Sequence, residues 1–146
     1  MNEKNWSVFC KLEEWILNNN YESYDICDIK GLPFFLTLSK FSNKSKFGKY
    51  IEYPVYQITN KFAARTRRIF RIEKKVYAQA QALIARAYIK VYKDFKEKSY
   101  LDKSLEIIKW LIENRITNYS YYCWGQPYAW FSRKIIPAYT PRTTVT

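Results

Sequence analysis

The fold is decided by the stretch KVYAQAQALIARAYIKVYKDF, residues 75–95, which contains neither Gly nor Pro. On a helical wheel with about 100° per residue, its apolar side chains occupy most of the circumference. Four polar side chains share one narrow strip: Gln79, Arg86, Lys90 and Lys93. A helix that is apolar nearly all round is typical of a helix enclosed by neighbours, and its many Ala residues allow those neighbours to approach closely. The stretch therefore predicts a buried helix over 75–95.

The next stretch, LDKSLEIIKWLIENRI (residues 101–116), is amphipathic in the ordinary way. One apolar stripe and one charged face predict a helix with a single buried side. Ser99 and Asp102 resemble a capping box at its start. Trp110 falls opposite the stripe, which indicates an exposed residue or a second interface. The two stretches predict an antiparallel hairpin with a buried inner helix and a half-exposed outer one.

This asymmetry favours one all-α architecture, an (α/α) toroid, in which inner helices are surrounded and outer helices form the rim. A four-helix bundle would give each helix similar amphipathicity. Elsewhere we expect a helix over 4–17 and a second over 53–70, with Pro54 in its first turn and a basic end. Residues 21–48 look irregular, with a short helix or an extended piece near 34–41.

Composition limits the chemistry. The 146 residues suit one domain, here a single helical domain over 1–146. Because His is absent, Ser-His and Cys-His nucleophile systems and His metal sites are excluded. Cys10, Cys27 and Cys123 lack metal-type or redox-type spacing, so we expect free thiols and neither metal nor cofactor.

No apolar run has the roughly 20 residues of a membrane span, which predicts a soluble cytoplasmic protein.

The charge of the chain favours anionic partners. Twenty-five Lys and Arg residues against thirteen Asp and Glu residues give a net charge of +12. Such a field attracts nucleic acid, acidic glycans, phosphorylated or nucleotide sugars, or anionic lipid. The alternative is that much of the excess charge lies on solvated surface.

The C-terminal segment carries the strongest functional signal. Four Tyr and two Trp lie within 119–130, where Gly125 and Pro127 interrupt any helix. Aromatic side chains of this kind stack on sugar rings or bases while offering a polar tip. The candidate ligand-binding residues are Tyr122, Trp124, Tyr128 and Trp130 for stacking, with Gln126 and Arg133 for polar contacts. Alternatively, these aromatic residues plug the end of a helical barrel.

The run Tyr-Cys-Trp-Gly-Gln-Pro-Tyr-Ala-Trp-Phe-Ser-Arg, residues 122–133, followed by Thr140-Pro141, resembles a loop in a bacterial protein family. These are six-hairpin (α/α) toroid proteins, glycosidase-like, associated with capsule and surface-polysaccharide biosynthesis. Their loop reads Gly-Tyr-Cys-Trp-Gly-Tyr-Pro-Phe-Asp-Trp-Gln-Ser-Arg, then Thr-Pro. The segment 24–28 is similar to the family's early Tyr-Asp-x-x-Asp. Two positions depart from the loop: Ala129 replaces an Asp and Phe131 a Gln.

The resemblance implies a polysaccharide-biosynthesis protein that binds an anionic glycan or sugar phosphate in a toroid cleft. With about two of six hairpins, the chain would correspond to an incomplete N-terminal part of that toroid. Asp25 and Asp28 are candidate acid/base residues, or alternatively turn and cap residues, and the sequence leaves open whether a reaction is catalysed.

Two other functions stay open. One is a nucleic-acid-binding helical module using the basic stretch 61–75, although no known nucleic-acid motif is present. The other is an inactive truncated remnant that binds a partner or self-associates through an exposed hairpin side.

Overall fold

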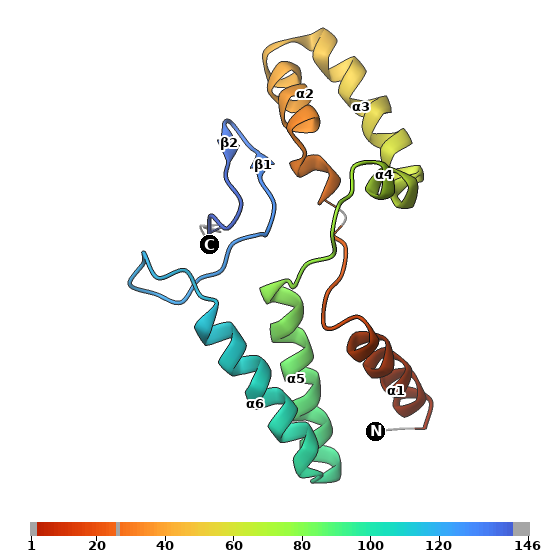
Figure 1. Ribbon diagram of the computed structural model, residues 1–146, viewed down its shortest axis with the longest axis vertical. Helices are drawn as coiled ribbons and strands as arrows, with labels where there is room; N and C mark the ends of the chain where they lie inside the picture. Colours follow the sequence, from red (N-terminus) through yellow and green to blue (C-terminus); the bar gives the residue numbers. More distant parts are fainter. Residues whose placement is uncertain (1–2, 26, 142–146) are drawn as a thin grey trace. The chain divides into compact units, whose positions relative to one another are not determined.

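The computed structural model describes residues 3–25 and 27–141 (Figure 1). These residues are mostly helical, as predicted, with one small two-stranded sheet. The chain forms two compact units, each drawn from two separate stretches of sequence. The first unit comprises Met1–Ser23 and Lys75–Trp124, and the second comprises Tyr24–Lys74 and Gly125–Thr146. Among the residues described, no helix combines the length and the apolar character needed to cross a membrane.

The first unit is built around an antiparallel helix pair, α5 (Ala78–Phe95) and α6 (Lys98–Glu113), which lie side by side in Figure 1. The turn between them is short because Lys96 adopts a left-handed conformation with φ of 59°. Where the helices meet, the fully buried Ser104 hydroxyl donates a hydrogen bond of 3.1 Å to the Ala85 carbonyl. Small residues on both helices thus permit close contact.

Helix α1 (Glu3–Asn18) completes this unit through aromatic contacts. Phe9 meets the rings of Tyr88 and Tyr100 edge-on, with centroids 6.1 and 5.9 Å away. An ion pair of 2.6 Å between Lys103 Nζ and Glu13 Oε1 ties α1 to α6. Burying these rings supplies the apolar contact that holds α1 in place.

The expected asymmetry between the two paired helices is wrong for the described chain. Helix α5 buries one side only: Gln81, Ala85, Tyr88 and Val91. Its Leu83 is 57% exposed, and α6 buries a comparable stripe. The reason is that Ala counts as apolar on a wheel but carries little surface, so an Ala-rich face requires no cover. Trp110 is half-buried.

The start of α6 also differs from the expectation. The helix begins at Lys98 with Glu97 as its N-cap residue, and no side chain caps it. The Ser99 hydroxyl donates to Glu97 Oε1 at 2.8 Å instead of capping a backbone N–H. The predicted capping box of Ser99 and Asp102 is therefore wrong, because the helix starts before Ser99.

The described residues of the second unit form four helical segments: η1 (Ile29–Gly31), α2 (Pro33–Lys44), α3 (Lys46–Lys61) and α4 (Ala63–Ile69). The short-helix alternative for residues near 34–41 is confirmed by α2, although much of 21–48 is not irregular. The predicted helix over 53–70 is wrong in two respects: its first residue and its continuity. It begins at Lys46, which places Pro54 inside α3, and it breaks at Phe62, whose φ of −110° and ψ of 31° leave the helical region.

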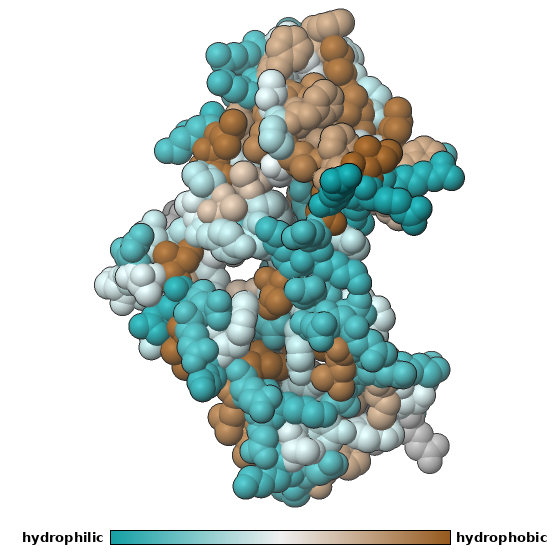
Figure 2. Space-filling view, viewed as in Figure 1, coloured by the Kyte–Doolittle hydropathy of each residue, from teal (hydrophilic) through white to brown (hydrophobic). Residues whose placement is uncertain are grey.

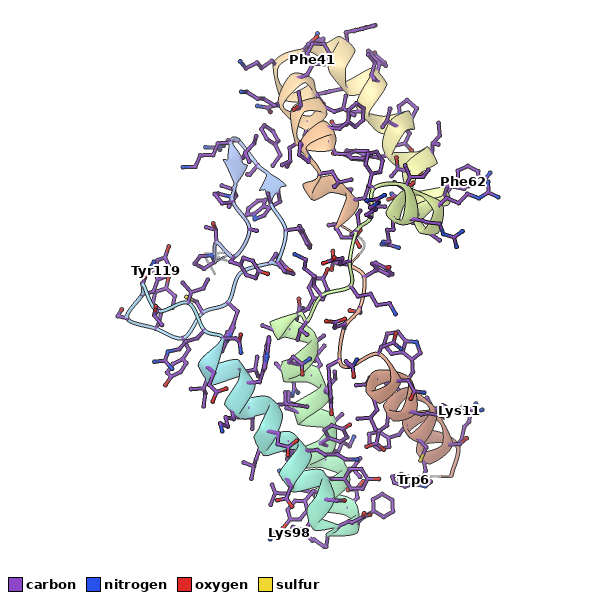
Figure 3. The ribbon with its side chains drawn as sticks, viewed as in Figure 1. Trp6, Lys11, Phe41, Phe62, Lys98 and Tyr119 are labelled. Carbon is purple, nitrogen blue, oxygen red and sulfur yellow. The ribbon has the colours of Figure 1, made fainter. Side chains whose placement is uncertain are left out.

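Helices α2 and α3 form a hairpin with only Ser45 between them. Gly48 makes this possible, because a Cβ at that position would lie 2.6 Å from the Ser42 Cα. Further along, the ring of Phe35 stacks on Tyr56 with centroids 5.8 Å apart. Hydrophobic side chains nevertheless reach the surface over α2 and α3, at the top of Figure 2, and Phe41 and Phe62 are labelled in Figure 3.

The C-terminal segment is not only a loop. Strands β1 (Trp130–Phe131) and β2 (Ile135–Ile136) pair antiparallel, with Trp130 opposite Ile136 and Phe131 opposite Ile135. β1 packs beside α2 and η1. The segment predicted as a long aromatic loop therefore contains a short hairpin, which places the end of that loop against the helices of the second unit.

Candidate ligand-binding site

A pocket of about 490 Å³ opens in the second unit. Its walls come from η1 and the segment before it, α2, α3, and the C-terminal segment that includes β1. The lining residues are Cys27, Lys30, Ser39, Ser42, Asn43, Lys49, Glu52, Tyr56, Gln126, Tyr128, Trp130, Phe131 and Ser132. Such a volume and a mixture of aromatic and polar groups are typical of small-molecule sites.

Contacts with Asp25, Gly31 and Tyr139 fix the aromatic wall of this pocket. The Tyr128 hydroxyl donates to Asp25 Oδ1 at 2.8 Å. Gly31 lies so close that a Cβ there would meet the Ala129 carbonyl oxygen at 2.8 Å. Further along, the Tyr139 N–H donates to the Gln126 carbonyl at 2.7 Å. These contacts hold the segment 126–129 at three positions.

A hydrogen-bonded chain of three side chains links the two helices of the pocket. The Ser39 hydroxyl donates to Glu52 Oε1 at 2.7 Å and lies 2.6 Å from the Tyr56 hydroxyl. Since a serine hydroxyl carries one hydrogen, Tyr56 donates to Ser39. Burial raises the pKa of Tyr56, and the neighbouring Glu52 carboxylate raises it further. Tyr56 therefore stays a neutral donor near pH 7.

The charges at the pocket are mainly positive. Lys30 Nζ lies 5.0 Å from the centre of the Tyr56 ring, and Lys49 is a second cation in the wall. Among the described lining residues, Glu52 carries the only carboxylate. An anionic group that enters the pocket would meet two ammonium groups, whereas hydroxyls can donate to Glu52.

Asp25 and Asp28 lie in the turn before η1 and outside the described pocket lining. Asp28 is buried, caps η1 through a 2.6 Å bond from the Ile29 N–H, and forms a 2.9 Å ion pair with Arg67 Nε. Asp25 Oδ1 accepts from the Cys27 N–H at 2.7 Å as well as from Tyr128. Their geometry matches the turn-and-cap alternative.

The structure brings together three of the six predicted ligand-binding residues: Gln126, Tyr128 and Trp130. Arg133 is exposed and lines a second, smaller pocket of the same unit. Tyr122 and Trp124 belong to the first unit. There the Trp124 indole N–H donates to the Leu111 carbonyl at 2.8 Å, which fits a packing role. Tyr122 is exposed and lies 5.0 Å from the Arg115 guanidinium.

Tyr119 marks the outer turn of the loop after α6 in Figure 3 and lies in the first unit.

The basic stretch 61–75 contributes part of its charge to internal contacts. Its Arg67 guanidinium is committed to Asp28 and lies 4.8 Å from the Tyr24 ring centre. The predicted nucleic-acid surface therefore has fewer available cations than the sequence suggested.

The helical half of the pocket was missed by sequence reasoning. Lys49, Glu52 and Tyr56 follow one another at spacings of three and four on α3, so they share one face. On α2, Ser42 and Asn43 lie three and four residues after Ser39, which places both near it on one side of the helix. This polar periodicity was the available signal, and it becomes visible once α3 is started at Lys46 rather than at Tyr53.

Within the described ranges, no group of three or more Cys, Asp or Glu side chains is placed to hold a metal ion. Cys10, Cys27 and Cys123 are free thiols. Comparisons with protein-family models, with curated proteins and with solved structures found no match to this chain.

Proposed function

We propose that the pocket of the second unit binds an anionic saccharide or a sugar phosphate. One observation carries the proposal: Tyr128 and Trp130 share a pocket with Lys30 and Lys49 and with a set of hydroxyl and amide groups. Indole and phenol rings cover the apolar faces of sugar rings. Ammonium groups bind a carboxylate or phosphate, and Ser, Asn and Gln side chains bind sugar hydroxyls.

In this proposal, the binding residues and the positioning residues differ. Asp25 and Asp28 act as positioning residues, because Asp25 holds Tyr128 and Asp28 holds Arg67, whose guanidinium also donates to the Asp25 carbonyl. Glu52 accepts hydrogen bonds from sugar hydroxyls while the Tyr56–Ser39 chain orients its carboxylate. Binding rather than bond cleavage is thus the activity that the arrangement supports.

We further propose that the biological setting is surface-polysaccharide biosynthesis and that the helices belong to an (α/α) toroid. The support is the resemblance of residues 122–133 and the presence of two helical hairpins, α2–α3 and α5–α6. On α3, Phe47, Ile51 and Ile58 recur on one face and are exposed. Such a face is what a hairpin of a toroid presents to a neighbouring hairpin.

The binding proposal is tested by titrating the chain with galacturonic acid and with glucose 1-phosphate while recording Trp fluorescence. We expect a saturable change with at least one of these ligands and a weaker one with neutral glucose. Trp130→Phe should remove most of the signal. Because a charge-assisted hydrogen bond contributes about 1.5–3 kcal/mol, Lys49→Ala should weaken binding roughly tenfold or more.

The matched control is Lys98→Ala, an exposed lysine of the first unit, which should leave the affinity unchanged. Absence of saturable binding by every saccharide refutes the proposal. Tighter binding of a single-stranded oligonucleotide than of any saccharide would instead support the nucleic-acid alternative.

A further inference from the structure

We propose that the ligand is an acidic oligosaccharide of at least two sugar units, whose second anionic group is bound by a cationic pocket next to the main one. This inference rests on the proposed saccharide function and specifies its substrate class. The cationic pocket has a volume of about 290 Å³. It is lined by Lys40, Asn43, Lys44, Phe131, Arg133, Lys134 and Ile135.

The two pockets are neighbours within the second unit. Asn43 and Phe131 line both of them, so these two side chains form a common wall. A ligand that fills the main pocket and extends past this wall enters the cationic pocket. A single sugar unit occupies one of the two pockets, whereas a chain of two or more units can occupy both pockets.

The cationic pocket is assembled from two directions. Lys40 and Lys44 are four residues apart near the end of α2 and therefore share a helix face. Arg133 and Lys134 lie in the turn between β1 and β2. A 3.0 Å hydrogen bond from the Ser132 N–H to the Lys134 carbonyl closes that turn. Two separate elements thus bring four cations to one small hollow.

Among the residues that the structure describes, no carboxylate compensates these four cations. In the part of the chain that the structure describes, no carboxylate oxygen lies within 4.0 Å of any of them, and no carboxylate lines the pocket. The half-buried cations Arg67 and Lys103, by contrast, are each paired. Four like charges in one place repel one another, and an anion bound among them relieves that repulsion.

The remaining lining favours a sugar over a free phosphate. Phe131 and Ile135 face each other across the β1–β2 pair and supply apolar surface between the cations. A small inorganic anion makes no use of that surface, but the ring face of a uronic acid does. The chemistry therefore points to successive acidic sugar units, one stacked in each pocket.

The test compares galacturonic acid with its α-1,4-linked trimer, and uses neutral maltotriose to report the effect of length alone. Binding is measured by calorimetry and by Trp fluorescence. We expect the acidic trimer to bind about tenfold or more tightly than the monomer, because a second set of charge-assisted contacts is added. Maltotriose should show no comparable gain.

The diagnostic variant is the double substitution Arg133→Gln and Lys134→Gln. It should bind the monomer as the unchanged chain does and lose about the whole trimer advantage. Lys40→Gln with Lys44→Gln is a second variant with the same expectation, built on a different element. Lys90→Gln with Lys93→Gln, two exposed lysines of the first unit, removes the same charge and should keep the advantage.

Equal affinity for monomer and trimer, or a trimer advantage that survives both diagnostic variants, overturns this inference while leaving the saccharide site intact. Failure of the underlying function looks different, because neither the monomer nor the trimer then binds. An oligothymidylate that binds more tightly than the trimer and depends on the same four cations would assign the pocket to nucleic acid and also overturn the inference.

Discussion

Burial of the Tyr88 side chain makes the stability of the first unit depend on pH. This residue is 1% exposed, and its ring contacts those of Phe9 and Tyr100. Burial raises the pKa of Tyr88 well above the ordinary value of 10, and nearby Tyr21 and Glu13 act in the same direction. Above pH 10 the unfolded chain releases this proton while the folded chain retains it. The folded state is therefore destabilised as pH rises.

Tyr88→Phe should make this alkaline loss of stability shallower. One proton held only by the folded state lowers the free energy of unfolding by about 1.4 kcal/mol per pH unit. Urea unfolding between about pH 8 and pH 11.5 measures the slope. The bond to Glu13 also raises the pKa of Lys103, so this group too holds its proton more firmly in the folded state and adds to the slope. Tyr119→Phe, an exposed control, should keep the original slope. Identical slopes for Tyr88→Phe and the unchanged chain would show that this buried phenol has no part in the effect.

At the scale of elements, the pocket depends on how closely α3 approaches α2. A Cβ at Gly48 would lie 2.6 Å from the Ser42 Cα and 2.8 Å from its backbone N. Backbone atoms cannot turn aside as a side-chain tip does, so any side chain here forces the helices apart. Ser42 and Asn43 of the pocket lie at this contact and would move with α2.

Gly48→Ala should therefore lower both stability and saccharide affinity, even though Ala is intrinsically better than Gly in a helix by about 1 kcal/mol. Overpacking of this kind typically costs 1–3 kcal/mol. Thermal unfolding followed by circular dichroism gives the stability, and the fluorescence titration gives the affinity. Gln57→Ala, at an exposed α3 position, reports propensity alone and should be neutral or slightly stabilising. A Gly48→Ala chain as stable as this control contradicts the close approach.

The elements that could be predicted from the sequence are those with an unbroken apolar period. The helices over 4–17, 75–95 and 101–116 correspond to α1, α5 and α6 within a few residues. The start of α3 was missed even though Ser45, a residue type favoured at N-caps, occupies its N-cap position, where it makes no side-chain capping bond. Pro54 was then misread as a first-turn residue. Strands of two residues, such as β1 and β2, are too short to show an alternating pattern.

The candidate site likewise had one part that could be predicted from the sequence and one part that could not. Its aromatic half was visible from composition alone, since Gln126, Tyr128 and Trp130 belong to a conspicuous aromatic run. Trp124 belongs to that run too, but its indole bonds the Leu111 carbonyl, and composition does not reveal such a partner. The helical half comes from segments far away in sequence. Only tertiary structure brings them to the same pocket.

At the scale of the whole molecule, the structure shows where part of the net charge of +12 lies. The two adjacent pockets contain six cations: Lys30, Lys40, Lys44, Lys49, Arg133 and Lys134. Glu52 is the single carboxylate among their described lining residues. Part of the excess charge is thus concentrated where the proposed anionic ligand binds, rather than spread evenly as solvated surface.

Added salt should consequently weaken the binding of an acidic saccharide. The Debye length falls from about 10 Å at 0.1 M to about 3 Å at 1 M, so exposed cations such as Arg133 and Lys134 are screened progressively. Between about 0.05 M and 0.5 M NaCl we expect the dissociation constant of the galacturonic acid trimer to rise roughly tenfold. That of maltotriose should hardly change, because stacking on Trp130 does not depend on charge. Calorimetry at four or five salt concentrations gives both slopes. If the neutral and acidic trimers respond alike, the cations are not ligand contacts, and the excess charge is solvated surface after all.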